Sequence, residues 1–277
     1  MPELPEVRTV CEALKPKILN KKIKSIDIFY PKLFKEYQPE VFVEALVGQK
    51  IVDIKNKGKH IIFFLDNNDV LLSHLRMEGK YRYYQDKDPN EKHLIMKMIF
   101  EDNSILHYLD TRMFGTFHLR NINNYNQILP LSKVADEPAY IDVNEVYQKL
   151  RKSTTAIKTK LLDQTIVSGI GNIYVDETLF ICKVHPETPA NMISLEKLAE
   201  IIKTSAEVME KSFQLGGTTL FSYESLNQKQ GSYQNFLQIH SNDIKICKRC
   251  ESETSKIKVN GRGTYLCSNC QRKENEF

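Results

Sequence analysis

The sequence predicts an α+β protein in which an N-terminal β-sandwich with flanking helices precedes a helical region and a small metal-binding β-hairpin. Three observations predict this class. Short β-rich runs fill residues 23–119, helical periodicity dominates beyond residue 140, and four of the six cysteines form two tight pairs near the C-terminus. At 277 residues the chain lies at the upper edge of what one domain usually holds, so we expect two domains.

A short helix is expected to open the chain. Four apolar residues share the i, i+3, i+4 and i+7 spacing of one helix face: Val7, Val10, Cys11 and Leu14. Pro5 suits a first helical turn, and Pro16 is expected to end the helix.

The β-rich region comes next and runs from Ile23 to about Leu119. Apolar runs such as residues 61–65 and 70–72 are separated by turn formers at residues 66–68. This pattern predicts a β-sandwich or barrel, which a helix near residues 39–46 interrupts.

A polar stretch at residues 121–140, with Pro130 and Pro138, is the best linker candidate. Beyond it we expect a long helix with Ser194 as N-cap and Gly216-Gly217 at its end. One apolar stripe, most simply interpreted as core packing, follows this helix: Leu195, Leu198, Ile202, Val208, Met209 and Phe213.

Charge and hydropathy narrow the class of protein only in part. The net charge of +4 and the pI near 8.6 are compatible with a polyanionic partner without requiring one. No run of apolar residues approaches the roughly 18 that a membrane span needs, and no signal peptide opens the chain. We therefore expect a soluble, intracellular protein.

The strongest inorganic signal is a double Cys-x-x-Cys pattern. Sixteen residues separate the pair Cys247 and Cys250 from the pair Cys267 and Cys270, which is typical of one tetrahedral Zn²⁺ held by four thiolates. Such a closed shell predicts one structural zinc; a redox dithiol pair and free thiols are the alternatives. Between the pairs we expect a β-hairpin with Arg262 at its tip, suited to a phosphate or minor-groove contact if it is more than a solvated charge.

The N-terminus offers a possible nucleophile. Proline as second residue permits removal of Met1, which leaves the Pro2 amine beside the carboxylates of Glu3 and Glu6. An α-amino group titrates near neutrality, so a useful fraction is nucleophilic. On residue type alone, a simple helix start is the favoured interpretation of these residues.

Several motifs then occur in one order along almost the whole chain. They are Met1-Pro-Glu-Leu-Pro-Glu6, Asn56-Lys-Gly-Lys-His60, His74-Leu-Arg-Met-Glu-Gly79, Asp110-Thr-Arg-Met-Phe-Gly115, Gly169-Ile-Gly-Asn-Ile-Tyr174, Gly216-Gly-Thr-Thr-Leu220 and the cysteine pairs. This ordered set resembles the formamidopyrimidine-DNA glycosylase family. Leu4 favours that family over the related endonuclease VIII, which typically has glycine there and prefers oxidised pyrimidines.

The resemblance implies a DNA repair enzyme with three parts. Residues 1–133 would form a catalytic β-sandwich domain, residues 134–236 a DNA-binding helix–two-turn–helix region, and residues 237–277 a four-cysteine zinc finger. Such an enzyme acts as a monomer on damaged double-stranded DNA in the bacterial cytoplasm, associated with the nucleoid. It removes oxidised purines such as 8-oxoguanine and formamidopyrimidines, and it cleaves the abasic strand by β,δ-elimination.

The resemblance also implies residue roles. Pro2 would be the nucleophile, with Glu3, Glu6 and Lys59 as further catalytic residues. DNA contacts would come from His74, Met77, Arg112, Phe114, Lys158, Asn172 and Arg262. Weaker candidates for contact with the lesion are Glu78, Thr218, Thr219 and the segment 222–232. Core packing is the alternative for Met77 and Phe114, and a solvated surface charge is the alternative for Lys59.

Two departures from the commonest family pattern, Thr111 for proline and Met113 for arginine, put the preference for the opposite base in doubt. Two other functions stay open at this point. One is an endonuclease VIII-like enzyme for oxidised pyrimidines. The other is a non-catalytic zinc-ribbon DNA-binding protein, in which Pro2, Glu3 and Lys59 would be incidental.

Overall fold

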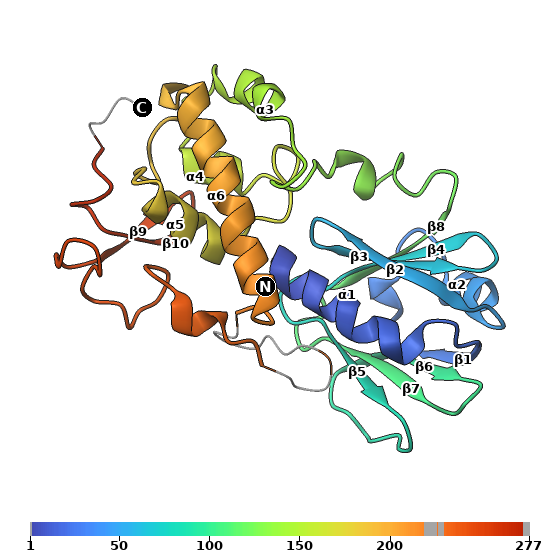
Figure 1. The fold of residues 1–277 in the computed structure, drawn as a ribbon. Coiled ribbons are helices and arrows are strands. Elements are labelled where there is room, and N and C mark those ends of the chain that lie inside the picture. Colours follow the sequence, from blue (N-terminus) through green and yellow to red (C-terminus); the bar gives the residue numbers. More distant parts are fainter. Residues whose placement is uncertain (1, 219–225, 227–229, 274–277) are drawn as a thin grey trace. The chain divides into compact units, whose positions relative to one another are not determined.

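The computed structural model describes residues 2–218, 226 and 230–273. The chain divides into two compact units, which Figure 1 shows as ribbons. The first unit comprises residues 1–132 and 215–232, and the second comprises residues 133–214 and 233–277. No helix in the described part is long and apolar enough to cross a membrane.

The first unit begins with helix α1 (Leu4–Ile18), which lies alongside strand β2 (Figure 1). Its apolar face is buried as the spacing predicts. The expectation that Pro16 ends the helix is wrong: the helix continues to Ile18, and the Leu19 N–H bonds the Lys15 carbonyl. A proline this close to the end removes a single helical hydrogen bond, so the last turn tolerates it.

Two four-stranded antiparallel sheets form the predicted β-sandwich. The order β1-β6-β7-β5 joins β1 (Ile23–Ile28), β6 (Leu94–Phe100), β7 (Ile105–Leu109) and β5 (Lys80–Tyr84). The order β2-β3-β4-β8 joins β2 (Ile51–Lys57), β3 (His60–Leu65), β4 (Asp69–His74) and β8 (Thr116–Asn121). Helix α2 (Pro39–Leu46) confirms the helix expected inside the β-region.

Aromatic rings run through the core of the sandwich. Neighbouring pairs have ring centroids 4.7–5.9 Å apart, in the order Phe42, Phe34, Phe117, Tyr108, Tyr81 and Phe63. Most of these pairs meet edge to face, the arrangement that suits the charge distribution of aromatic rings. This row of rings links the β2-β3-β4-β8 sheet to the β1-β6-β7-β5 sheet, so it fixes how the loops at the strand ends are placed.

The second unit is helical except for one hairpin. Its helices are α3 (Val143–Leu150), α4 (Ile157–Leu161), α5 (Asn172–Ile181) and α6 (Leu195–Gln214). The Ser194 hydroxyl accepts the Lys197 N–H at 3.1 Å, which confirms the predicted cap of α6. Gly216 and Gly217, which follow the helix in the sequence, both have positive φ angles, as expected where a helix ends.

Strands β9 (Ser255–Val259) and β10 (Arg262–Leu266) form the hairpin between the cysteine pairs. Asn260 and Gly261 connect them with φ angles of 44° and 78°, the pattern of a tight type I′ turn. Arg262 is exposed and follows the turn directly, paired with Val259.

Two neighbouring acids of α5 bind the hairpin and the segment 238–240 within the second unit. Asp176 accepts hydrogen bonds from Lys158 Nζ at 2.7 Å, from His240 Nδ1 at 2.7 Å and from the Tyr265 N–H at 3.0 Å. Glu177 accepts the backbone N–H groups of residues 238, 239 and 240 at 2.8–2.9 Å. Both acids are fully buried, so these bonds stabilise carboxylates that water does not reach.

The Lys158–Asp176 ion pair should be important for stability, since both side chains are almost completely buried. Replacing Lys158 with alanine leaves a buried carboxylate without its cation. We expect the free energy of unfolding to fall by about 3–5 kcal/mol in denaturant titrations of the zinc-loaded protein. The exposed Lys152 is the matched control, because Lys152→Ala should change stability by less than about 0.5 kcal/mol. Equal losses for the two variants would contradict this role.

Candidate active site and metal centre

The start of α1 holds the three N-terminal candidates, Pro2, Glu3 and Glu6, all of them buried. One Glu6 oxygen accepts the Glu3 N–H at 2.8 Å, and the other accepts the Thr218 N–H at 2.8 Å. Glu3 and Glu6 also form a reciprocal capping box at the helix start. The Glu6 side chain therefore fixes the backbone next to Pro2 and the beginning of the segment after Gly217.

Lys59 lies in the two-residue turn between β2 and β3, where Gly58 takes a positive φ angle of 52°. Its side chain is 6% exposed, so the alternative of a solvated surface charge is wrong. His60 follows it and pairs with His74 across β3 and β4, with ring centroids 4.5 Å apart. The charge of Lys59 lies near enough to contribute to lowering the pKa of His74.

Burial keeps this histidine pair neutral. Burial first, and then the electrostatic effect of neighbouring His60 and Arg76 on an added proton, holds the pKa of His74 well below its usual value. Burial also lowers the pKa of His60 to about 4. The Nδ1 atom of His74 accepts the Arg76 N–H at 2.9 Å, so the single ring proton lies on Nε2. His74 can therefore donate a hydrogen bond to an anionic oxygen without carrying a charge.

The loops at residues 75–79 and 110–115 present the expected DNA-wedge residues. Met77 and Phe114 are 37% and 53% exposed, so the alternative that they are core residues is wrong. The Arg112 guanidinium lies over the Phe114 ring, 4.7 Å from its centroid. The buried Asp110 carboxylate accepts the backbone N–H groups of Arg112, Phe114 and Gly115 at 2.7–3.0 Å, which fixes the second loop.

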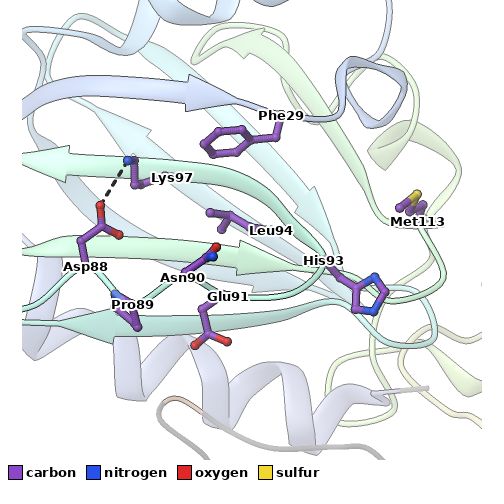
Figure 2. A pocket seen from close by; sticks show the side chains of 9 residues that line it. All are labelled: Phe29, Asp88, Pro89, Asn90, Glu91, His93, Leu94, Lys97 and Met113. Carbon is purple, nitrogen blue, oxygen red and sulfur yellow. Dashed lines mark hydrogen bonds and ion pairs between the residues drawn. The ribbon is translucent and has the colours of Figure 1, made fainter.

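A cavity of about 560 Å³ lies beside the second loop (Figure 2). Met113 lines it together with Phe29, Asp88, Pro89, Asn90, Glu91, His93, Leu94 and Lys97. Its acids are already paired, since Lys97 and His107 bind Asp88 and Arg82 binds Glu91. No sequence pattern predicts this cavity, because its lining residues come from distant parts of the chain; Met113, a departure from the family pattern, is one of them.

In the second unit, the structure brings Asn172 and the hairpin of Arg262 together. Asn172 begins α5, and its side-chain amide donates to the Gly263 carbonyl at 2.9 Å. Lys158 is instead 1% exposed, and its ammonium binds Asp176 and, at 2.8 Å, the Thr264 hydroxyl. A direct phosphate contact by Lys158 does not fit this geometry, because the ammonium lies in the interior and its donors face buried acceptors.

The candidates for lesion contact are only partly described. Glu78 is half-buried in the first wedge loop, and Thr218 is buried with its N–H on Glu6. Thr219 lies outside the described residues, and so does most of the segment 222–232.

The four paired cysteines converge at one point of the second unit. Their sulfur atoms all lie within 4.8 Å of one another, with Cys247 to Cys270 at 3.9 Å and Cys250 to Cys267 at 3.4 Å. Zn–S bonds of about 2.3 Å in a tetrahedron place sulfurs about 3.8 Å apart, so the geometry fits one zinc ion. The Arg249 N–H donates to the Cys247 sulfur at 3.4 Å, and hydrogen bonds of this kind orient metal-binding side chains. Four thiolates complete the shell, so this zinc is structural.

Comparisons with known proteins agree along the whole chain. Three family descriptions match it: "Formamidopyrimidine-DNA glycosylase N-terminal domain" at residues 1–117, "Formamidopyrimidine-DNA glycosylase H2TH domain" at residues 134–224, and "Zinc finger found in FPG and IleRS" at residues 245–272. The fold and the site thus define a zinc-containing DNA glycosylase of the helix–two-turn–helix class. The chain belongs to the formamidopyrimidine-DNA glycosylase family, whose members are base-excision repair glycosylases with lyase activity at abasic sites.

Individual relatives cover the full length. The chain is 54% identical over 276 residues to the formamidopyrimidine-DNA glycosylase of Mycoplasmopsis pulmonis, covering 99% of each protein. It is 52% identical to that of Mycoplasma mobile, covering 98% of this chain and 99% of the relative.

Solved structures of Lactococcus lactis FPG share the fold. An FPG variant in complex with DNA containing Fapy-dG has a TM-score of 0.92 and 40% identity, and a complex with abasic-site DNA has a TM-score of 0.91 and 40% identity. Each comparison covers 98% of this chain and 100% of the solved one.

Removal of zinc should unfold the hairpin region, because binding to four thiolates is coupled to folding. We expect one zinc per chain by elemental analysis, and a chelator should lower the melting temperature. Cys247→Ser should abolish stoichiometric zinc. Cys182→Ala changes a buried cysteine outside the cluster and should retain one zinc per chain. Full zinc content in Cys247→Ser would exclude the four-thiolate site.

The buried His60 predicts a specific pH dependence of stability. Its pKa of about 4 in the folded protein is below the value near 6.5 expected on unfolding, so below that pH the unfolded chain binds more protons. The free energy of unfolding should therefore fall between pH 6.5 and 4, by on the order of 3 kcal/mol from this group.

The substitution His60→Leu should flatten that decline, and His93→Gln, at an exposed histidine, should leave it as in the wild type. Denaturant titrations across this pH range measure both. The same pH profile in His60→Leu and the wild type would show that His60 is not its source.

Proposed function

We propose that this chain excises oxidised purines, 8-oxoguanine and formamidopyrimidines, from duplex DNA and then cleaves the abasic strand through a covalent intermediate on Pro2. The observation that carries the proposal is the buried start of α1, where Glu6 clamps the backbone that presents Pro2 and Glu3. Chain ends are usually mobile, and fixing this one places a nucleophile beside an acid.

The chemistry requires removal of Met1, because only a free Pro2 secondary amine is a nucleophile. Its nitrogen attacks C1′ of the damaged nucleotide, and the departing base takes up a proton as the C1′–N bond to the base breaks and the amine loses its own. The C1′–O4′ bond of the sugar then breaks, and an iminium ion remains at C1′. The buried Glu3 donates a proton to the sugar as its ring opens. General acid help of this kind is worth about 10²–10⁴-fold.

Strand cleavage follows from the same iminium ion. It acidifies the C2′ proton, whose loss expels the 3′ phosphate by β-elimination. A second elimination expels the 5′ phosphate and leaves a one-nucleotide gap. Lys59, buried in the β2–β3 turn, assists base removal, and its ammonium is attracted to the adjacent DNA phosphate.

Access to the damaged base requires its extrusion from the helix. The exposed Met77, Arg112 and Phe114 then fill the vacated space, with apolar side chains between base steps and the guanidinium toward the unpaired base. His74, Asn172 and Arg262 contact phosphates, whereas Lys158 positions the hairpin. In this proposal the enzyme acts as a monomer at the bacterial nucleoid, with residues 1–133 catalytic, 134–236 DNA-binding and 237–277 the zinc finger.

The purine preference is supported by Leu4 and by the solved relatives. Structures with TM-scores of 0.92 and 0.91 contain Fapy-dG DNA and carbocyclic 8-oxo-G DNA. Oxidised pyrimidines, the endonuclease VIII-like alternative, are the competing substrate class.

Borohydride trapping tests the proposal directly, because it reduces the iminium to a stable protein–DNA adduct. Protein with a verified Pro2 N-terminus should be trapped on duplexes with 8-oxoguanine opposite cytosine more than on an oxidised-pyrimidine duplex. Glu3→Gln should slow base excision by about 10²–10⁴-fold. Glu12→Gln, an exposed acid on the same helix, is the control and should match the wild type.

Pro2→Gly, which exchanges the secondary amine for a primary one, should reduce the adduct while DNA binding persists. Adducts mainly on the pyrimidine lesion would transfer the assignment to the endonuclease VIII-like alternative. Binding without an adduct on either duplex would leave a zinc-dependent DNA-binding protein.

A further inference from the structure

The hydroxyl of Tyr108 occupies an unusual position in the sandwich. Tyr108 lies on β7, is fully buried, and packs edge-on against Phe117 and Tyr81. Its hydroxyl has no hydrogen-bond partner among the residues that the structure describes. Burial holds its pKa well above the usual value, so the group stays neutral. A buried hydroxyl without a partner is unfavourable, and phenylalanine would give the same ring packing without that cost.

Two glycines enclose this hydroxyl. A Cβ atom on Gly79 would lie 2.2 Å from the Tyr108 oxygen, and one on Gly115 would lie 2.0 Å from it. Neither glycine has a φ angle in the left-handed region, so the requirement for glycine is one of space. The hydroxyl therefore fills the room that two absent side chains leave.

These glycines close the two loops that carry the wedge residues. The Gly79 N–H bonds the Leu75 carbonyl at 2.9 Å and closes residues 75–79. The Gly115 N–H bonds the Asp110 carboxylate at 2.7 Å and closes residues 110–115. Each loop thus touches the same oxygen atom at the point where it closes on itself.

Both loops also contain a residue in a strained backbone conformation. Arg76 and Met113 have φ angles of 53° and 55°, which side chains other than glycine rarely adopt. Such conformations persist only where the surroundings fix them. A rigid ring with its oxygen between the loop ends supplies that support from within the core.

We propose that Tyr108 is a positioning residue whose hydroxyl acts as a spacer between the two wedge loops and fixes the separation of Met77 from Arg112 and Phe114. This inference rests on the proposed function, in which those three side chains replace an extruded nucleotide. The spacer acts sterically, since its oxygen is held between backbone atoms of both loops.

A thermal double-mutant cycle tests the contact without any DNA. Gly115→Ala should lower the melting temperature by roughly 5 °C or more, because its Cβ meets the hydroxyl. In the Tyr108→Phe background the nearest remaining atoms are ring carbon Cζ at 3.0 Å and an Asp110 oxygen at 3.1 Å, so most of that loss should disappear. Tyr108→Phe alone should leave the melting temperature unchanged or raise it, because it removes an unsatisfied hydroxyl.

Gly79→Ala is the matched control for this cycle. Its Cβ would also lie 2.6 Å from the backbone oxygen of Leu75, which Tyr108→Phe does not remove. Its thermal loss should therefore persist in both backgrounds. If Gly115→Ala lowers the melting temperature equally in the wild-type and Tyr108→Phe backgrounds, the spacer contact does not exist.

A comparison of two substrates tests the effect on the wedge. With the lesion that the wild type excises best, Tyr108→Phe should lower kcat by about three- to tenfold and leave KM nearly unchanged, because phosphate contacts are intact. Cleavage of a preformed abasic site, which has no base to extrude, should slow by less than about twofold.

Tyr81→Phe separates this effect from ordinary destabilisation. The Tyr81 hydroxyl donates to Ser73 at 2.8 Å, so its loss should lower the melting temperature but keep the wild-type ratio of excision to abasic cleavage. A wild-type ratio in Tyr108→Phe overturns the positioning role. A wild type inactive on every lesion would instead refute the proposed function, while the thermal cycle still decides the contact.

Discussion

The site depends on the Glu6 carboxylate, which holds the chain start in place. A terminus normally samples many conformations, so a nucleophile at residue 2 would be poorly placed without it. Glu6 removes that freedom by accepting hydrogen bonds from the N–H groups of Glu3 and Thr218. Thr218 is 212 positions away from Glu6 in the sequence. Helix α1 then supplies a rigid base for this end of the chain. The active site thus gains its order from one buried side chain.

Buried carboxylates that accept several backbone N–H groups also order other loops of this protein. Asp110 binds three N–H groups of a wedge loop, and Glu177 binds the N–H groups of residues 238, 239 and 240, ahead of the first cysteine pair. Asp176 joins a lysine, a histidine and the hairpin backbone. Burying a carboxylate is costly, but charge-assisted hydrogen bonds to several donors offset that cost. In these loops, hydrogen bonds to buried carboxylates fix the backbone, as hydrogen bonds to neighbouring strands do within a sheet.

The sequence predicted those features whose signals are local. Hydrophobic period located the sandwich and its inner helix, Ser194 marked a cap, and cysteine spacing identified the zinc site. Sequence patterns did not predict contacts whose two residues lie far apart along the chain. The family resemblance predicts Lys158 as a DNA contact, and no local pattern reveals its buried acceptors, Asp176 and Thr264, which are 18 and 106 residues away. Likewise, no local pattern shows that Gly79 and Gly115 meet at Tyr108, since that contact needs both the pairing of β5 with β7 and the packing of the two sheets.

Burial divides the functional side chains by task. The groups assigned to chemistry, Pro2, Glu3 and Lys59, are buried, so their distances to a substrate are fixed before it arrives. Met77 and Phe114 are exposed, which is unfavourable for apolar groups in water. In the proposed complex with DNA, bases would cover these side chains, and the cost of their exposure would then favour the complex over the free protein. If the wedge loops were mobile in the free protein, ordering them on binding would cost conformational entropy and weaken the complex. Asp110 and Tyr108 hold the loops in place before binding, so this entropy cost is small.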